Sequence, residues 1–235
     1  MSLRQMVKNS FAGPLIRRLY FQVESRRFAG SRDYWQRRYR AGGSSGPGSV
    51  GRLARFKADV LNAFVRENSV SSVVEFGYGD SSQLELCEYP KYLGLDVSPV
   101  AVDLCRRRFM GDATKSFAVL GTVDPGRHDV ALSLDVIFHL VEDAAFEAHM
   151  TDLFASGERF VVIYSSNGTD MPSAPHVRHH RLTDWIEQNR STWVLRRKIP
   201  NKYPYDSRNE EETSFADFYI FENTTRDRPN LAAVP

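Results

Sequence analysis

The stretch VVEFGYGDSS, residues 73–82, runs an apolar segment into a carboxylate and two closely spaced glycines. A glycine loop between a buried strand and the following helix is where doubly wound folds bind nucleotides. Asp96, in YLGLDVS, follows Gly77 at about the distance, roughly 20 residues, at which such folds place the acid that holds ribose hydroxyls. Glu75, Gly77, Gly79 and Asp96 are therefore predicted to bind a ligand that contains a ribose.

Two details indicate which ligand this is. The third position of the G-x-G-x-x-G pattern holds Ser82, so the loop lacks the third glycine that serves a dinucleotide's pyrophosphate. Glu75, two residues before Gly77, would repel a pyrophosphate but would suit a positively charged group. The loop therefore favours S-adenosylmethionine, whose methionine end is cationic.

A candidate catalytic pair lies in SLDVIFHLVED, after the fourth predicted strand. Asp135 and His139 are four residues apart, so they would share one face if this segment is helical. Methyl transfer from a sulfonium is an in-line displacement in which the enzyme positions the acceptor and removes its proton. We expect His139 to accept a hydroxyl proton, with Asp135 orienting it or binding the substrate. The alternative is a structural, hydrogen-bonded histidine.

A second polar cluster, HVRHHR at residues 176–181, follows the fifth predicted strand. Loops in this position commonly carry substrate contacts. His176, Arg178 and His179 are therefore predicted to bind the substrate, with Arg178 suited to an anion or a polyol. His180 is a further candidate base or metal ligand. A solvated loop is the alternative interpretation.

A divalent metal such as Mg²⁺ is a further hypothesis for this site. Its ligands would be Asp135, His139 and one histidine of the second cluster, for which His176 is the candidate.

These residues need a scaffold of alternating strands and helices. Apolar residues recur at helical spacing over residues 52–68, and Ser98 with Pro99 predicts the start of a helix. The helix that starts at Ser98 and Pro99 is predicted to continue over residues 101–109, and further helices are predicted at 142–154 and 182–189. Strands are predicted at 72–76, 92–97, 117–120, 129–134, 159–164, 192–198 and 215–222. This alternation predicts a doubly wound, mostly parallel α/β sheet covered on both faces. The last two strands lack a helix between them and are expected to be antiparallel.

Length and composition bound the possibilities. The 235 residues, 42% of them hydrophobic, suit one domain with a substantial core. The sequence holds two cysteines and lacks an apolar run of membrane-spanning length, so we expect a cytoplasmic protein in a reducing compartment. Residues 1–40 carry ten Lys or Arg against two acids, which predicts a basic N-terminal arm of charge +8 on a body of charge −6. The glycine- and serine-rich segment 41–49 predicts a mobile connection, and residues 224–235 a flexible tail.

The segments EFGYG and GLD resemble the first motif and the ribose-acid motif of class I S-adenosylmethionine-dependent methyltransferases. The resemblance covers about residues 52–222 and implies a seven-stranded Rossmann-like sheet with an antiparallel final strand. It also implies that residues 1–50 include a helical lid, in which Tyr39 and Arg40 contact the cofactor and Arg40 pairs with its carboxylate. The sequence departs from the family at Ser81, where a third glycine is common, and at GTV, residues 121–123, where an adenine-contacting acid is expected.

The combination of lid, loop, SLDVIFHL and HVRHH resembles bacterial sugar and polysaccharide O-methyltransferases, including those acting on mannosides. The resemblance implies a small-molecule, carbohydrate acceptor, and a homo-oligomer is compatible with it. DNA methylation is disfavoured, because the Asn/Asp-Pro-Pro-aromatic motif is missing after the fourth strand. Methylation of nitrogen or of another small metabolite, RNA methylation through the basic arm, a non-catalytic S-adenosylmethionine-binding module and a nicotinamide oxidoreductase remain alternatives.

Overall fold

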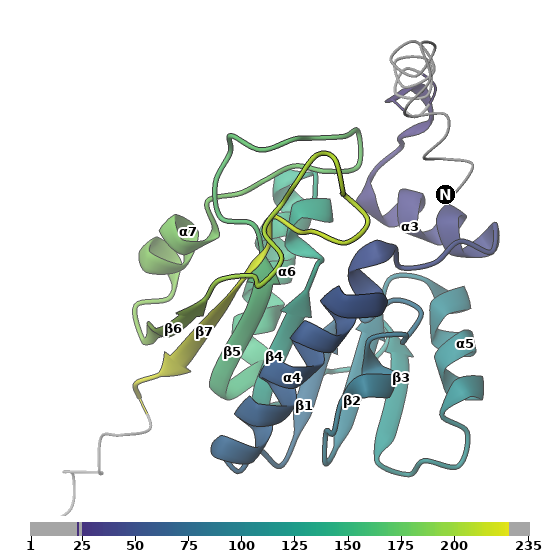
Figure 1. Ribbon diagram of the computed structural model, residues 1–235. Coiled ribbons are helices and arrows are strands. Elements are labelled where there is room, and N and C mark those ends of the chain that lie inside the picture. Colours follow the sequence, from purple (N-terminus) through teal and green to yellow (C-terminus); the bar gives the residue numbers. More distant parts are fainter. Residues whose placement is uncertain (1–22, 24, 226–235) are drawn as a thin grey trace, which may run out of the picture.

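A single seven-stranded sheet forms the centre of the computed structural model, which describes residue 23 and residues 25–225 (Figure 1). The strand order is β3-β2-β1-β4-β5-β7-β6. The strands are β1 (Val73–Phe76), β2 (Tyr92–Asp96), β3 (Lys115–Val119), β4 (His128–Leu134), β5 (Gly157–Ser165), β6 (Trp193–Ile199) and β7 (Asp217–Asn223). Strands β1 to β5 pair in parallel, whereas β7 runs antiparallel between β5 and β6. The predicted fold class is therefore confirmed.

Helices cover both faces of the sheet. Helices α4 (Gly51–Glu67) and α5 (Pro99–Arg108) pack on one face, and α6 (Asp143–Ser156) and α7 (Leu182–Asn189) pack on the other (Figure 1). Helix α5 begins as predicted, because Ser98 caps it by accepting the backbone N–H of Ala101 and Pro99 occupies its first turn. The connection from β3 to β4, residues 120–127, contains no helix.

Helix α3 (Ser31–Arg40) lies over the carboxyl ends of the central strands (Figure 1). The segment that follows it, for which the sequence predicted a mobile connection, is hydrogen-bonded to the glycine loop. Ser45 donates its backbone N–H to Asp80 at 2.8 Å, and its hydroxyl accepts the backbone N–H of Asp80 at 2.8 Å. The predictions for most of the basic arm and of the C-terminal tail fall on residues 1–22, 24 and 226–235, outside the described residues.

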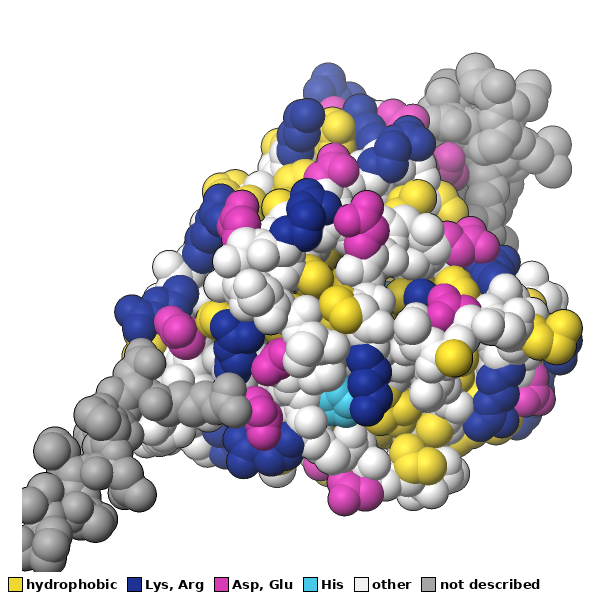
Figure 2. All heavy atoms as spheres, turned by 90° about the horizontal axis from the view of Figure 1, so that it is seen from below, with side chains coloured by type: hydrophobic (Ala, Val, Ile, Leu, Met, Phe, Trp, Pro, Cys, Tyr) yellow, Lys and Arg dark blue, Asp and Glu magenta, His cyan; other side chains and the backbone are white. Residues whose placement is uncertain are grey.

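The opposite end of the molecule carries charges of both signs. Figure 2 shows Lys and Arg interspersed with Asp and Glu on this face, and the ion pairs Arg66–Glu88 and Arg127–Glu158 lie at this end. Across the described range, no helix has the length and hydropathy needed to cross a membrane.

Candidate functional site

A cavity of about 320 Å³ lies at the carboxyl ends of the parallel strands. Its floor is formed by the end of β1 and the glycine loop, its sides by the segments after β2, β3 and β4, and its cover by α3. Glu75, Gly77, Gly79 and Asp96 all line it. The structure therefore brings together the four residues that the sequence predicted to share a site.

The glycine loop needs its glycines for conformation and for close packing. Gly77 and Gly79 have φ values of 82° and 69°, in the left-handed region that favours glycine. A Cβ on Gly77 would lie 2.5 Å from the side chain of Val136, and one on Gly79 would collide with the hydroxyl of Ser45. Side chains at these positions would push the loop away from the segment after β4 and from the cover.

Ser81 stands at the position where the resembled family often has a third glycine. Its φ is 63°, and its side chain is fully buried. The Ser81 hydroxyl donates to the backbone carbonyl of Asp80 at 2.6 Å. The backbone therefore keeps the glycine-like conformation although the residue is a serine.

Asp96 anchors the glycine loop and keeps acceptor capacity for a ligand. Its two carboxylate oxygens accept the backbone N–H groups of Gly79 at 3.0 Å and Ser98 at 2.8 Å. Burial raises the pKa of Asp96 to about 6. A carboxylate has about four lone-pair sites, so two backbone donors leave sites for the hydroxyls of a ribose diol.

Glu75 is a buried carboxylate in the cavity wall. It accepts a hydrogen bond from the Tyr92 hydroxyl at 2.8 Å. Burial raises the pKa of Glu75 to about 7, although the Tyr92 hydrogen bond and the positive charge of Lys57 oppose this rise. A cationic ligand would favour the ionised form of Glu75.

Lys57, on α4, is a cavity residue that was not predicted from the sequence. Its side chain is buried, and Nζ donates to Asp135 Oδ2 at 2.5 Å. The sequence did contain a pattern that could have identified Lys57. It lies four residues after Leu53 and four before Leu61, on the apolar face of α4. A charged residue on such a face needs a buried partner.

Asp135 pairs with Lys57, and the predicted arrangement with His139 does not form. Asp135 has a φ of 59°, and the single 3-10 turn η3 (Ile137–His139) begins after it. The four-residue α-helical spacing therefore does not apply, and no hydrogen bond links the two side chains.

His139 lines the cavity as a neutral imidazole. Its Nδ1 must donate to the backbone carbonyl of His176, at 2.9 Å, because a carbonyl only accepts. Burial lowers the pKa of His139 to about 3, so Nε2 carries a lone pair at physiological pH. The ring of Trp35 from α3 packs edge-on against it, with 4.9 Å between ring centroids.

The second cluster has structural roles in this conformation, and its predicted substrate-binding residues lie outside the cavity lining. His176 stacks on Tyr34 with 4.2 Å between centroids. The Arg178 guanidinium bonds to the carbonyl of Val141 and pairs with Asp143, and both ring nitrogens of His179 are bonded, to Ser166 and to a backbone carbonyl.

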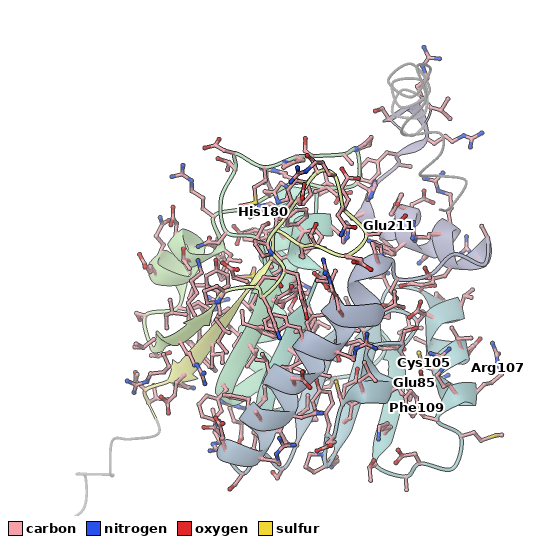
Figure 3. The ribbon with its side chains drawn as sticks, viewed as in Figure 1. Glu85, Cys105, Arg107, Phe109, His180 and Glu211 are labelled. Carbon is pink, nitrogen blue, oxygen red and sulfur yellow. The ribbon has the colours of Figure 1, made fainter. Side chains whose placement is uncertain are left out.

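His180, labelled in Figure 3, lies at the same end of the molecule as α3. It donates to the backbone carbonyl of Leu140 at 2.9 Å and stacks on Phe146. Like the rest of its cluster, it supports the loop after β5. Its contacts are with residues distant along the chain, so the sequence alone did not predict them.

The predicted metal site is not formed. Asp135 is paired with Lys57, and His176 stacks on Tyr34 outside the cavity lining. Within the part of the chain that the structure describes, no group of three His, Cys, Asp or Glu side chains is placed to hold a metal ion. The hypothesis that Asp135, His139 and His176 bind Mg²⁺ is therefore dropped.

The cover of the cavity is fastened at both ends of α3. Ser31 bonds to the carboxylate of Glu142 through its N–H at 2.8 Å and its hydroxyl at 2.6 Å, and Tyr39 contacts the Ser45 hydroxyl at 3.0 Å. Tyr39 lines the cavity as predicted, but Arg40 does not. Arg40 is exposed and bonds to Gln36, because it lies one residue, about 100°, away from Tyr39 around the helix.

The fold is shared with several solved methyltransferase structures. They include the methyltransferase domain of bacterial CtHen1-C, 16% identical over 73% of this chain and 99% of that chain, with a TM-score of 0.58. Magnesium protoporphyrin IX methyltransferase from Synechocystis PCC 6803 with bound SAH is 17% identical over 81% of this chain and 96% of that chain, with a TM-score of 0.58. N-methyltransferase NodS from Bradyrhizobium japonicum WM9, in complex with S-adenosyl-L-homocysteine, is 14% identical over 73% of this chain and 86% of that chain, with a TM-score of 0.55.

Sequence comparisons add no closer relative, since no protein-family model and no curated protein match this chain. The structural neighbours differ in their acceptors, which include a porphyrin and, for NodS, nitrogen. At these identities the likeness concerns the fold. The chain has the fold of the class I S-adenosylmethionine-dependent methyltransferases.

Proposed function

We propose that this protein is an S-adenosylmethionine-dependent methyltransferase. The observation that carries the proposal is the pair of buried carboxylates, Glu75 and Asp96, at the ends of adjacent strands in one cavity. Asp96 retains acceptor sites for a ribose, and Glu75 suits a cation. Glu75 would oppose a diphosphate beside the glycine loop, so the nicotinamide alternative has less support.

When bound, S-adenosylmethionine supplies an activated methyl group on a sulfonium. The task of the protein is then to hold donor and acceptor in line and to exclude water. Asp96 and Glu75 would hold the ribose and the charged end, and Trp35 and Tyr39 on α3 would cover them. In the proposed cycle, the hydrogen bonds at the two ends of α3 open and close as ligands enter and leave.

We further propose that the acceptor is a hydroxyl of a small molecule, and specifically of a sugar or glycoside. His139 supports the hydroxyl, because Nε2 is a neutral acceptor on the cavity wall. Its low pKa makes it a weak proton acceptor, so it would orient the hydroxyl rather than fully remove its proton. The carbohydrate is supported by the sequence resemblance alone, since His176, Arg178 and His179 lie outside the cavity lining.

Calorimetry with S-adenosylmethionine and S-adenosylhomocysteine tests the cofactor, and NAD serves as the negative control. Transfer of a tritiated methyl group to a panel of glycosides, amines and RNA tests the acceptor. We expect binding of both adenosyl ligands and label in a glycoside. Binding without transfer to any acceptor would support a non-catalytic module, and binding of NAD alone would refute the proposal.

A further inference from the structure

Lys57 is the one Lys or Arg among the buried residues of the described chain. It is 1% exposed, yet it lines the cavity. An ammonium is rarely buried without full pairing, because its desolvation is unfavourable. Its position therefore calls for a reason beyond helix packing.

Pairing with Asp135 uses only part of the ammonium. A lysine ammonium has three donors, and among the described residues Nζ has one hydrogen-bond acceptor, Asp135 Oδ2 at 2.5 Å. The ring of Tyr164 lies 5.3 Å from Nζ and contributes a weaker cation–π contact. Donor capacity therefore remains in the wall of a cavity.

Charges of alternating sign surround this position. Asp135 lies on one side of Lys57, and Glu75 is near enough for the Lys57 charge to act on it. When all three are ionised, one positive and two negative charges give the group a net charge of −1. S-adenosylmethionine carries a sulfonium, an ammonium and a carboxylate, a net charge of +1. Group and ligand are therefore opposite in net charge.

Resting on the methyltransferase function proposed above, we propose that Lys57 binds the carboxylate of the cofactor's methionine end while Glu75 faces its ammonium. Lys57 thus takes the role predicted for Arg40, which lies outside the cavity. Asp135 is a positioning residue, because it holds the Lys57 ammonium in place from the side of β4. Arg32 is the competing cation, since it also lines the cavity, but it is exposed and belongs to the cover.

Four ligands separate the roles of these residues. S-adenosylmethionine and S-adenosylhomocysteine carry both the ammonium and the carboxylate, decarboxylated S-adenosylmethionine lacks the carboxylate, and 5′-methylthioadenosine lacks both. Their dissociation constants are measured by calorimetry with the full chain, for the wild type and for Lys57→Met, Glu75→Gln and Arg32→Met. The double variant Lys57→Met/Asp135→Asn serves if Lys57→Met alone leaves Asp135 unpaired and fails to fold.

We expect Lys57→Met to raise the dissociation constants of S-adenosylmethionine and S-adenosylhomocysteine by roughly 10- to 150-fold, which is the range for loss of a hydrogen bond to a charged group. Binding of 5′-methylthioadenosine should stay within about 2-fold of the wild type, because this ligand has no methionine end. Binding of decarboxylated S-adenosylmethionine should not be weakened, because it lacks the carboxylate and loses only the repulsion of a nearby positive charge. Glu75→Gln should also weaken the binding of decarboxylated S-adenosylmethionine. Arg32→Met should not strongly weaken the binding of any of the four ligands.

Equal weakening of all four ligands by Lys57→Met would show that Lys57 only supports the fold of the cavity and would overturn the proposal. Unchanged binding, or a loss confined to Arg32→Met, would overturn it too. A wild-type protein that binds none of the four ligands would instead refute the proposed function.

Discussion

The substitution Glu75→Gln should stabilise the ligand-free protein while weakening cofactor binding. Burial raises the pKa of Glu75 from 4.5 to about 7, so the folded protein disfavours the carboxylate that the unfolded chain carries at neutral pH. A shift of about 2.5 pKa units corresponds to about 3 kcal/mol at about 1.4 kcal/mol per unit, an upper value for what the uncharged glutamine recovers. The glutamine carbonyl can still accept the Tyr92 hydrogen bond.

The stability gained by Glu75→Gln over the wild type should increase with pH. Below pH 4.5 the carboxyl is protonated in both states and contributes no difference. As pH rises toward 7, the unfolded chain loses the proton first, so the folded protein loses stability relative to it. The excess stability of Glu75→Gln should therefore be near zero at pH 4 and fully developed above pH 7.

Ligand binding should change in the opposite direction. A charge-assisted contact contributes about 1.5–3 kcal/mol, so Glu75→Gln should weaken S-adenosylmethionine by roughly 10- to 150-fold at pH 8. Wild-type affinity should rise between pH 5.5 and 8 as Asp96 and Glu75 ionise. The glutamine variant should show a smaller rise.

Urea unfolding at pH 5 and pH 8 measures the stability, and calorimetry measures the dissociation constant. Glu67→Gln, at an exposed glutamate, is the matched control and should leave the stability and the dissociation constant unchanged. The reasoning is refuted if Glu75→Gln destabilises the protein equally at both pH values, or if its affinity for S-adenosylmethionine equals that of the wild type.

Three further substitutions test other parts of the site. Asp96→Ala should weaken S-adenosylmethionine at least 10-fold by calorimetry, because each ribose hydrogen bond to a carboxylate contributes about 1.5–3 kcal/mol; unchanged affinity would exclude it from the ribose site. His139→Ala should lower methyl transfer about 10-fold with cofactor affinity retained, and a loss of 10³-fold or more would instead indicate a general base. Ser81→Gly should be about 1 kcal/mol more stable than Ser81→Ala in urea unfolding, because alanine keeps the left-handed strain; equal stabilities would contradict the strain.

Local patterns were sufficient to predict most of the scaffold. Apolar runs marked all seven strands, and Ser98 with Pro99 marked the start of α5. The absence of a helix between the last two strands predicted their antiparallel pairing. These features depend on residues that are neighbours along the chain, so periodicity and capping preferences carry the information.

The four residues of the glycine loop and ribose-acid motif that line the cavity were also accessible from the sequence. Glu75, Gly77, Gly79 and Asp96 follow β1 and β2, and adjacent parallel strands bring their carboxyl ends to the same edge of a sheet. Spacing along the chain was therefore enough to place these four residues in one cavity.

The partners of the charged and polar side chains were decided by the tertiary structure alone. The Lys57–Asp135 pair joins residues 78 positions apart, and His179 closes on Ser166 across a folded loop. The left-handed backbone at Asp135 cancelled the helical spacing that linked it to His139. Burial and partner choice arise from atoms that meet only after the chain has folded. The sequence by itself therefore identified the residues that meet in the cavity, and the three-dimensional packing decided which of their polar atoms remain available to a ligand.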